Sequence, residues 1–239
     1  LLHTVELPIV ENQFFPENYQ TLFDTLELSK FEKFKDELPA LRAIAEERNL
    51  GHIKLSHRLM DGSLIYNIKE CIKTDGIDFV VMGTSGATGW KEMFIGTNTG
   101  EVITSIGVPV LSVPLEAKFV KIETIGFREK DREALKQVIS IAKKTNAKVK
   151  CLYVNTKSSD NTEATFDDWK DHFKNEPVQF FILPSDEVKE TILEFIASQE
   201  IDILAMLTYK RSFFESLFSS SFTEKISYIS DIPILALHE

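Results

Sequence analysis

The stretch that decides the fold runs from Asp78 to Pro114, DFVVMGTSGATGWKEMFIGTNTGEVITSIGVPVLSVP. Its first part, Phe79–Met82, is an unbroken apolar run, as expected of a parallel strand that is covered on both faces. Two glycine turns follow, and a segment with helical character ends near Ser105. A second apolar run, Val110–Val113, then predicts the neighbouring strand. The order strand, glycine loop, helix, strand indicates an α/β fold.

The glycines between these two strands have the spacing Gly83-x2-Gly86-x9-Gly96-Thr97. Glycines let backbone amides approach phosphate oxygens closely and permit a positive φ. The N-terminus of the following helix adds unpaired N–H groups and a dipole that favours an anion. The alternative is that the glycines only shape two tight loops, but four spaced positions between two strands favour a phosphate site. The chain contains no Gly-Lys pair and no Gly-x-Gly-x-x-Gly turn here, which excludes a Walker-type P-loop and the dinucleotide fingerprint.

This spacing resembles the nucleotide-binding signature of the universal stress protein family at all four positions. The resemblance implies a cytoplasmic stress-response protein that binds ATP or a related adenine nucleotide. It places the phosphates on backbone amides that follow the predicted strand 79–82. It places the adenosine against Met82 and Thr4, although Thr4 is polar where the family usually has an apolar residue. The binding residues that it implies are Thr4, Met82, Gly83, Gly86, Ala87, Gly96, Thr97 and Asn98.

The chain repeats itself at an offset of 124 residues, which takes Asp78 to Asp202 and Val110 to Ile234. We therefore expect two tandem α/β domains, at residues 1–116 and 117–239, each with a doubly wound, mostly parallel five-stranded sheet. Strands are predicted at 1–8, 52–60, 79–82, 110–113, 120–127, 148–154, 178–183, 203–207 and 234–237. Helices are predicted at 19–48, 64–73, from after Thr99 to about 105, 130–145, 166–173, 187–199 and 214–229. In the family resembled, domains pair through their last strands, so the two domains are expected to form an internal pseudo-dimer, with a homodimer of chains as a further possibility.

The second copy lacks the glycines of the first. The same offset replaces Gly83 by Leu207, Gly86 by Lys210, Gly96 by Ser220 and Thr97 by Ser221, and no glycine follows Gly126. Side chains at these positions would crowd a phosphate. The second domain is therefore expected to bind no ATP and to have a structural role.

The family resembled begins with a strand and a helix that have no counterpart before Leu1, where the sequence starts within the predicted second strand. That first strand is central in the sheet of the family. Without it, neighbouring strands would keep unpaired backbone groups. We expect one strand-helix unit to be absent from the sequence or to come from another chain.

The bulk composition limits the partners. The chain has 239 residues, a net charge of −10 and 43% apolar residues, with no run near the ~20 apolar residues of a membrane span. The negative charge disfavours nucleic acid, whose binding depends on phosphate neutralisation, and suggests that ATP arrives with Mg²⁺. Cys71 and Cys151 are expected to be buried thiols in a reducing cytoplasm, and His52 and His57 have no neighbouring acidic or cysteine residue for a metal site.

No nucleophile-base pair or carboxylate dyad accompanies the glycines; Lys91 and Glu92 are the nearest charges, and a helix surface accounts for them. No catalytic residue is therefore assigned, and we expect a binding protein with at most slow ATP hydrolysis. A second hypothesis is a nucleotide-free scaffold in which both domains serve dimerisation and partner docking. A third is an enzyme or electron-transfer protein of the wider adenine-nucleotide α/β group, but the Ser-Gly-Gly loop that it would require is not visible.

Overall fold

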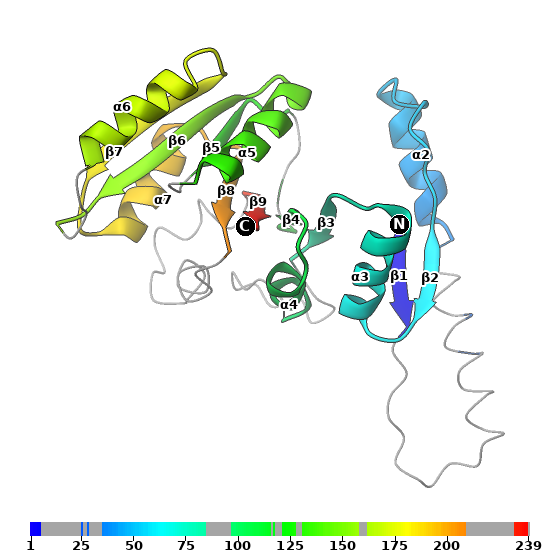
Figure 1. Cartoon of the computed structure of the whole chain (residues 1–239). Helices are drawn as coiled ribbons and strands as arrows, with labels where there is room; N and C mark the ends of the chain where they lie inside the picture. The colour runs from blue at the N-terminus through cyan, green and yellow to red at the C-terminus, as the bar shows by residue number, and fades with distance from the viewer. Residues whose placement is uncertain are drawn as a thin grey trace, which may run out of the picture. The chain divides into compact units, whose positions relative to one another are not determined.

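The computed structural model describes residues 1–5, 25, 28, 35–84, 97–115, 117, 121–127, 131–157, 162–208 and 232–238. They belong to two compact units, Leu1–Ile77 and Asp78–Glu239. Figure 1 follows the chain through both units from its blue N-terminus to its red C-terminus.

The larger unit is built on a seven-stranded sheet with the strand order β3-β4-β9-β8-β5-β6-β7 (Figure 1). Its strands are β3 (Val80–Gly83), β4 (Val110–Val113), β5 (Thr124–Phe127), β6 (Lys148–Asn155), β7 (Val178–Pro184), β8 (Ile203–Leu207) and β9 (Ile234–Leu237). Its helices are α4 (Thr97–Ser105), α5 (Arg132–Thr145), α6 (Thr162–His172) and α7 (Val188–Ser198). Neighbouring strands are parallel, apart from β4 and β9, which are antiparallel.

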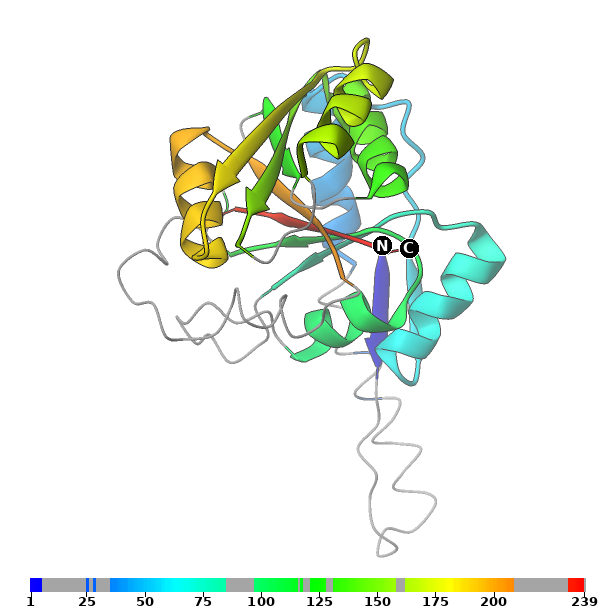
Figure 2. The same ribbon diagram turned by 60° about the vertical axis from the view of Figure 1, so that its left-hand side comes forward.

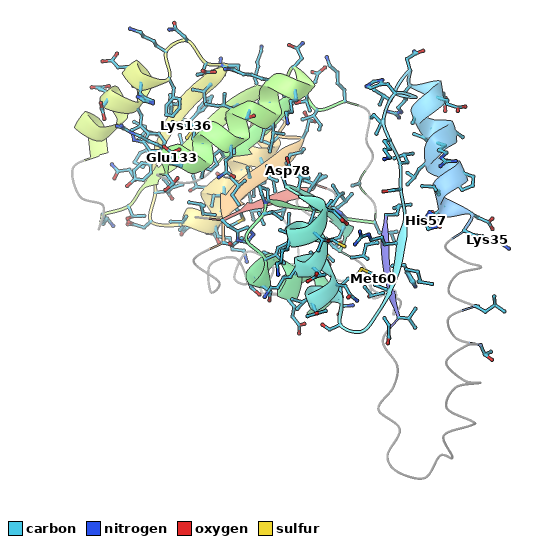
Figure 3. The ribbon with its side chains drawn as sticks, turned by 45° about the vertical axis from the view of Figure 1, so that its right-hand side comes forward. Lys35, His57, Met60, Asp78, Glu133 and Lys136 are labelled. Carbon is cyan, nitrogen blue, oxygen red and sulfur yellow. The ribbon has the colours of Figure 1, made fainter. Side chains whose placement is uncertain are left out.

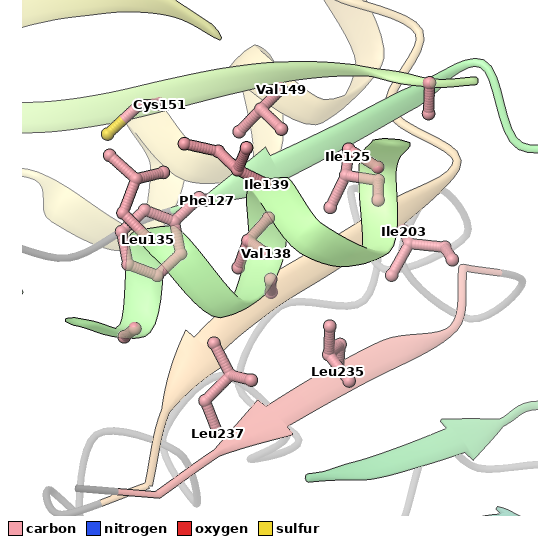
Figure 4. Packing of buried hydrophobic residues seen from close by; sticks show 14 of the residues in the cluster. Ile125, Phe127, Leu135, Val138, Ile139, Val149, Cys151, Ile203, Leu235 and Leu237 are labelled. Atoms are coloured by element: carbon pink, nitrogen blue, oxygen red, sulfur yellow. The ribbon is translucent and has the colours of Figure 1, made fainter. Parts of the chain in front are cut away.

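Helix α5 covers one face of the second repeat's sheet. It begins where the Asp131 carboxylate accepts a hydrogen bond from the Ala134 amide at 2.7 Å, and it ends at Asn146, whose φ of 56° is left-handed. Its buried stripe is Ala134, Leu135, Val138, Ile139 and Ala142, which packs on the apolar side chains of β5, β6, β8 and β9 (Figure 4). Full burial of each large side chain contributes about 1.5–3 kcal/mol.

Helix α6 belongs to the same apolar cluster as α5, through Trp169 and the adjacent Phe173. Helix α7 instead packs with the alternate residues of the sheet, Leu152, Val154 and Leu204. Because successive side chains of a strand point to opposite faces, α7 covers the other face (Figure 2). The five strands β7-β6-β5-β8-β9 therefore form a doubly wound α/β domain.

Strands β4 and β9 join the two repeats. Leu111 lies opposite its own repeat counterpart, Leu235, while Val110 faces Ala236 and Ser112 faces Ile234. Exchange of the two repeats leaves this register unchanged, so the pairing is symmetric about the two leucines. The buried Ser112 hydroxyl donates a further hydrogen bond to the Ile234 carbonyl oxygen at 3.2 Å.

The smaller unit contains a two-stranded parallel sheet of β1 (Leu2–Val5) and β2 (Arg58–Asp61), with helices α2 (Glu37–Glu47) and α3 (Leu64–Asp75). Helix α3 buries Ile68, Cys71 and Asn67. The Asn67 side-chain amide donates to the Asp61 carbonyl oxygen at 2.9 Å, and the Cys71 thiol lies 3.8 Å from the sulfur of Met60, which Figure 3 labels.

Most of the predicted elements are confirmed, and β4, β8 and β9 have the predicted bounds, while α4 ends where predicted but begins earlier, at Thr97. Cys71 and Cys151 are buried thiols, as expected. The strand predicted from His52 is wrong in its first half, because β2 begins only at Arg58. A turn in which the Ile53 amide binds the Leu50 carbonyl oxygen interrupts the extended chain, and Ile53 is 47% exposed rather than facing a core. The helix predicted at 214–229 lies outside the described residues.

The α/β class is confirmed, but the strands of the first repeat do not form one sheet of their own. Strands β1 and β2 pair with each other, whereas β3 and β4 join the sheet of the second repeat. The two compact units therefore divide at Ile77 and Asp78. The domain boundary between residues 116 and 117, which rests on the repeat, stays a prediction, as does the missing strand-helix unit.

Candidate functional site

The candidate site lies where β3 and β4 end and α4 begins. The two strands run parallel, so their carboxyl ends lie at one edge of the sheet, and the Thr84 amide donates to the Val113 carbonyl oxygen at 3.0 Å there. In the sequence, the predicted phosphate loop lies between Gly83, which ends β3 at this edge, and the first turn of α4. Carboxyl ends of parallel strands are where α/β sheets bind ligands.

One hydrogen bond ties the helix to the strand. The Thr99 hydroxyl donates to the Gly83 carbonyl oxygen at 2.9 Å, and Thr99 is only 2% exposed. Thr99 shares a helix face with the buried Val102, Ile103 and Ile106, at the spacing of a helical stripe. Its hydroxyl therefore lies among buried apolar side chains, where a polar group without a hydrogen bond would lower the stability of the fold. The bond holds the amino-terminal turn of α4 at the end of β3.

Sequence reasoning missed Thr99, although a signal was present. A threonine that occupies the first position of an apolar i, i+3, i+4, i+7 stripe needs a partner for its hydroxyl, and the nearest strand end supplies carbonyl groups.

Gly83 does not need the conformational freedom of glycine. Its φ is not positive, because it is still the last paired residue of β3. A Cβ built there meets, among described atoms, only the Val113 carbonyl oxygen, at 3.9 Å. The fold therefore tolerates a side chain at this exposed position, and the space that glycine leaves free is the feature that suits a ligand.

The structure brings three of the predicted residues to this place: Gly83 at the end of β3, and Thr97 and Asn98 in the first turn of α4. Met82 precedes Gly83 and is half-buried, and Asn98 is exposed. Thr4 lies on β1, in the other unit. Gly86, Ala87 and Gly96 lie outside the described residues. The assignment of these residues to a nucleotide stays a prediction.

The site has no basic side chain on β3, β4 or α4, whose sequences are VVMG, VLSV and TNTGEVITS. An anion here would be held by amides and by the dipole of α4. No cluster of three or more His, Cys, Asp or Glu side chains suited to a metal occurs in the described part of the chain. Among those same residues, no helix has the length and apolar character that crossing a membrane requires.

The equivalent edge of the second repeat is built differently. The Thr208 amide donates to the Leu237 carbonyl oxygen at 3.1 Å, as Thr84 does to Val113 in the first repeat. Here, however, the Thr208 hydroxyl also lies 3.1 Å from Nδ1 of the half-buried His238, and burial lowers the pKa of that imidazole. Leu207 occupies the place of Gly83 and is buried in the core.

Comparison with known proteins places a universal stress protein domain at residues 15–114. No curated protein matches the sequence. Among solved structures, a universal stress protein from Archaeoglobus fulgidus DSM 4304 superposes with a TM-score of 0.67 at 16% identity, over 100% of this chain and 84% of its own. A functionally unknown protein from Pseudomonas aeruginosa PAO1 gives a TM-score of 0.61 at 14% identity, over 99% of this chain and 92% of its own.

These two similarities support the fold and, at their low identity, nothing further. A universal stress protein from Archaeoglobus fulgidus in complex with dAMP is also similar, at 11% identity, over 49% of this chain and 98% of its own. Its TM-score of 0.32 is too low to bear on this chain.

Proposed function

We propose that the first repeat binds ATP or a related adenine nucleotide and that the chain acts as a nucleotide-dependent regulator in a cytoplasmic stress response. The universal stress protein domain at residues 15–114, which contains the whole glycine signature, supports this proposal. The phosphates would lie on the amides of Gly83, Gly86, Gly96, Thr97 and Asn98, with Ala87 alongside. Met82 and Thr4 would face the adenosine.

The observation that carries the proposal is the hydrogen bond between Thr99 and Gly83. It fixes the first turn of α4, where helix amides have no partner within the helix, beside the exposed glycine that ends β3. Those amides and the helix dipole together suit a phosphate. A Cβ at Gly83 would occupy space at this edge without disturbing the strand.

Magnesium would accompany the nucleotide. The chain has a net charge of −10, and β3, β4 and α4 carry no Lys or Arg to neutralise a triphosphate; Lys91, between β3 and α4 in the sequence, is one positive charge followed directly by Glu92. A divalent cation bound to the phosphate oxygens would supply that charge, with waters filling its coordination shell.

The proposed activity is binding rather than turnover. Catalysis of hydrolysis needs a group that positions or activates water, and α4 carries only one titratable side chain, the exposed Glu101. We expect ATP hydrolysis well below ~1 per second, the lower end of ordinary enzyme rates. A multiple-turnover phosphate-release measurement on pure protein checks this.

Calorimetric titration of the chain with Mg-ATP, ADP and AMP tests the proposal. We expect about one site per chain, and a loss of affinity of at least ~100-fold in Gly83→Val because the side chain fills the phosphate position. Gly107→Val is the matched control: Gly107 is exposed, and an added Cβ meets nothing within 4 Å. It should bind as the parent does. Two sites would show that the second repeat also binds nucleotide, and equal binding by Gly83→Val would refute the proposed site.

The scaffold hypothesis rests on a different observation, the symmetric β4–β9 pairing about Leu111 and Leu235. Through it the tandem chain would form an internal pseudo-dimer, with a homodimer of chains as a further step. The scaffold requires no nucleotide. It predicts that the Gly83→Val chain retains its cellular role, which a complementation assay under stress would reveal.

A further inference from the structure

The residues that directly follow β3 and β8 are both threonine, Thr84 and Thr208, at equivalent positions of the two repeats. Their backbones are held alike. The Thr84 amide donates to the Val113 carbonyl oxygen at 3.0 Å, and the Thr208 amide donates to the Leu237 carbonyl oxygen at 3.1 Å. Each threonine therefore has the same place at the carboxyl edge of the sheet, and the difference between the two lies in the side-chain hydroxyl.

In the second repeat the protein itself binds this hydroxyl. Oγ1 of Thr208 lies 3.1 Å from the Leu237 carbonyl oxygen and 3.1 Å from Nδ1 of His238. A carbonyl oxygen only accepts, so the hydroxyl gives it its single proton and accepts from Nδ1. Nε2 is then the unprotonated nitrogen of the neutral ring, and it is buried without a hydrogen-bond partner among the described residues. The proton of the Thr208 hydroxyl is therefore not available to a ligand.

In the first repeat the imidazole is replaced. Pro114 stands where the second repeat has His238, and a proline side chain has no group that can bind a hydroxyl. Within the part of the chain that the structure describes, the Thr84 hydroxyl makes no hydrogen bond. Thr84 is half-buried, so its side chain keeps contact with solvent. The proton that the second repeat uses internally is thus uncommitted in the first.

The position of Thr84 gives this proton a use. Thr84 follows Gly83, whose carbonyl oxygen binds the Thr99 hydroxyl at 2.9 Å and so lies beside the first turn of α4. The nucleotide site proposed above is made of N–H donors. A phosphate oxygen accepts hydrogen bonds, and a donor that binds an ionised acceptor makes one of the stronger hydrogen bonds. Such an oxygen needs a hydroxyl whose proton is free, and Thr84 meets this requirement where Thr208 does not.

We propose that the Thr84 hydroxyl binds a phosphate group of the nucleotide, and that the residue after the last strand of each repeat, Pro114 or His238, determines whether the threonine is available for this. The inference rests on the proposed nucleotide function and adds to it a ligand-binding side chain and a residue that controls it. The second repeat differs from the first in this respect independently of its missing glycines.

Calorimetric titration of the full chain with Mg-ATP tests the hydroxyl. Thr84→Val keeps the shape of the side chain and should lower the affinity about tenfold, as expected for loss of a hydrogen bond to a charged group. Thr84→Ser should restore most of it. Adenosine, which has no phosphate, should bind both variants and the parent equally in competition. Thr104→Val is the matched control, because the exposed Thr104 hydroxyl bonds only to carbonyl groups of its own helix.

An exchange between the repeats tests the controlling residue. Pro114→His brings the imidazole of the second repeat to Thr84 and should lower the affinity for Mg-ATP about tenfold, because the hydroxyl becomes engaged within the protein. Pro114→Ala removes the ring of proline without adding a donor and should bind as the parent does. In the chain that carries both Thr84→Val and Pro114→His, the loss should be no greater than in Thr84→Val alone, since both changes act on one hydroxyl.

The melting temperature without nucleotide tests the difference between the two threonines directly. Thr208→Val removes the acceptor of the His238 proton and one donor to Leu237, so the melting temperature should fall by about 2–4 °C. Thr84→Val removes no hydrogen bond to a described residue, and its melting temperature should stay close to that of the parent. Equal falls in the two variants would mean that the Thr84 hydroxyl is already engaged and would overturn the proposal.

The binding results separate this inference from the function on which it rests. Unchanged Mg-ATP affinity in Thr84→Val, with the affinity lost in Gly83→Val, would refute the hydroxyl and leave the nucleotide site intact. A parent chain that binds no nucleotide would refute both. A matching loss of adenosine affinity in Thr84→Val would assign the hydroxyl to the nucleoside and overturn the phosphate contact. Additive losses in Thr84→Val and Pro114→His would show that the imidazole acts by its bulk, and would refute the control by position 114.

Discussion

Strands β3 and β8 are copies of one strand in a repeated sequence, yet their surroundings differ. All five residues of β8 are buried, whereas Val81 of β3 is 61% exposed and Gly83 is open to solvent. Both strands keep the same hydrogen bonds to the last strand of their repeat. Among the described strands β3 pairs with β4 alone, so the comparison teaches that the burial of such an apolar run comes from a second neighbouring strand and a covering helix.

The carboxyl ends of the two strands differ in the same way, since that of β8 is buried and that of β3 is exposed. The second repeat closes its edge with Leu207 and with the pair of Thr208 and His238. The first repeat leaves Gly83 open and uses Thr99 to hold α4 beside it. One copy therefore fills this edge with side chains and the other leaves it open, and variants at matched positions can test whether the open edge holds a ligand.

The largest difference is expected at the leucines on the symmetry point of the β4–β9 pairing. Leu235 is 1% exposed and belongs to the cluster beneath α5, so Leu235→Ala should lower the free energy of unfolding by about 3 kcal/mol. Leu111 is only partly buried against that cluster, and Leu111→Ala should cost about 1 kcal/mol. Urea denaturation of the two variants measures both values. Equal losses would show that the two repeats are packed alike at their junction.

The aspartates that precede β3 and β8 should differ next. Asp202 accepts two amide hydrogen bonds from residues at the start of β5, and Asp202→Ala should destabilise the chain by about 2 kcal/mol because those amides lose a charged acceptor. Asp78 is exposed, and Asp78→Ala should change the free energy of unfolding by less than about 0.5 kcal/mol. Thermal and urea unfolding of both variants provide the measurement. A loss of similar size in Asp78→Ala would mean that its carboxylate is already engaged.

The hydrogen bond between the Thr99 hydroxyl and the Gly83 carbonyl oxygen should contribute less to the free energy of unfolding. Thr99→Val keeps the shape of the side chain but leaves the Gly83 carbonyl without its donor, so the free energy of unfolding should fall by about 1 kcal/mol. Thr99→Ser retains the hydroxyl and should keep most of the bond. Calorimetric titration with Mg-ATP then shows whether the hydrogen bond places α4 for nucleotide binding in addition to stabilising the fold. The affinity for Mg-ATP should fall in Thr99→Val and recover in Thr99→Ser. If both variants bind as the parent does, the bond has no part in placing α4 for a nucleotide.

Much of the fold was predictable because its strongest signals are local. The strands β4, β8 and β9 are short apolar runs bounded by proline or by polar residues. Because the sequence repeats after 124 residues, a strand predicted in one copy supports the strand predicted at the equivalent position of the other. The start of β2 was not predictable in this way. Residues 52–57 alternate in polarity as a strand does, but the chain turns at Ile53 and the strand begins only at Arg58. Alternation of polar and apolar residues indicates which side chains could face a core, but it does not indicate whether a neighbouring strand is present to pair with.

The candidate site was predictable only in part. The spacing of the glycines located the loop, and of the two properties of glycine that suit such a loop, Gly83 uses the space that a missing side chain leaves and not a positive φ. Thr99 carried a signal, its place at the start of an apolar helical stripe, but that signal does not identify its partner. The Gly83 carbonyl oxygen is recognised as the acceptor only when the helix and the strand are placed in three dimensions.

The smallest expected difference is a pH dependence that only the second repeat can have. Burial lowers the pKa of His238 below its ordinary value of 6.5, because the folded chain disfavours the charged imidazole, and its repeat counterpart is the non-titrating Pro114. The unfolded chain therefore takes up this proton first as the pH falls. The stability that the folded chain has with a neutral His238 is fully present above pH 6.5. It is lost as the pH falls from 6.5 through the lowered pKa of His238 in the folded chain. Urea denaturation between pH ~7.5 and ~5.5 should show a shallower loss for His238→Gln than for the parent chain. Parallel curves would mean that the imidazole accepts its proton as readily in the folded chain as in the unfolded one, and that the Thr208–His238 pair is open to water.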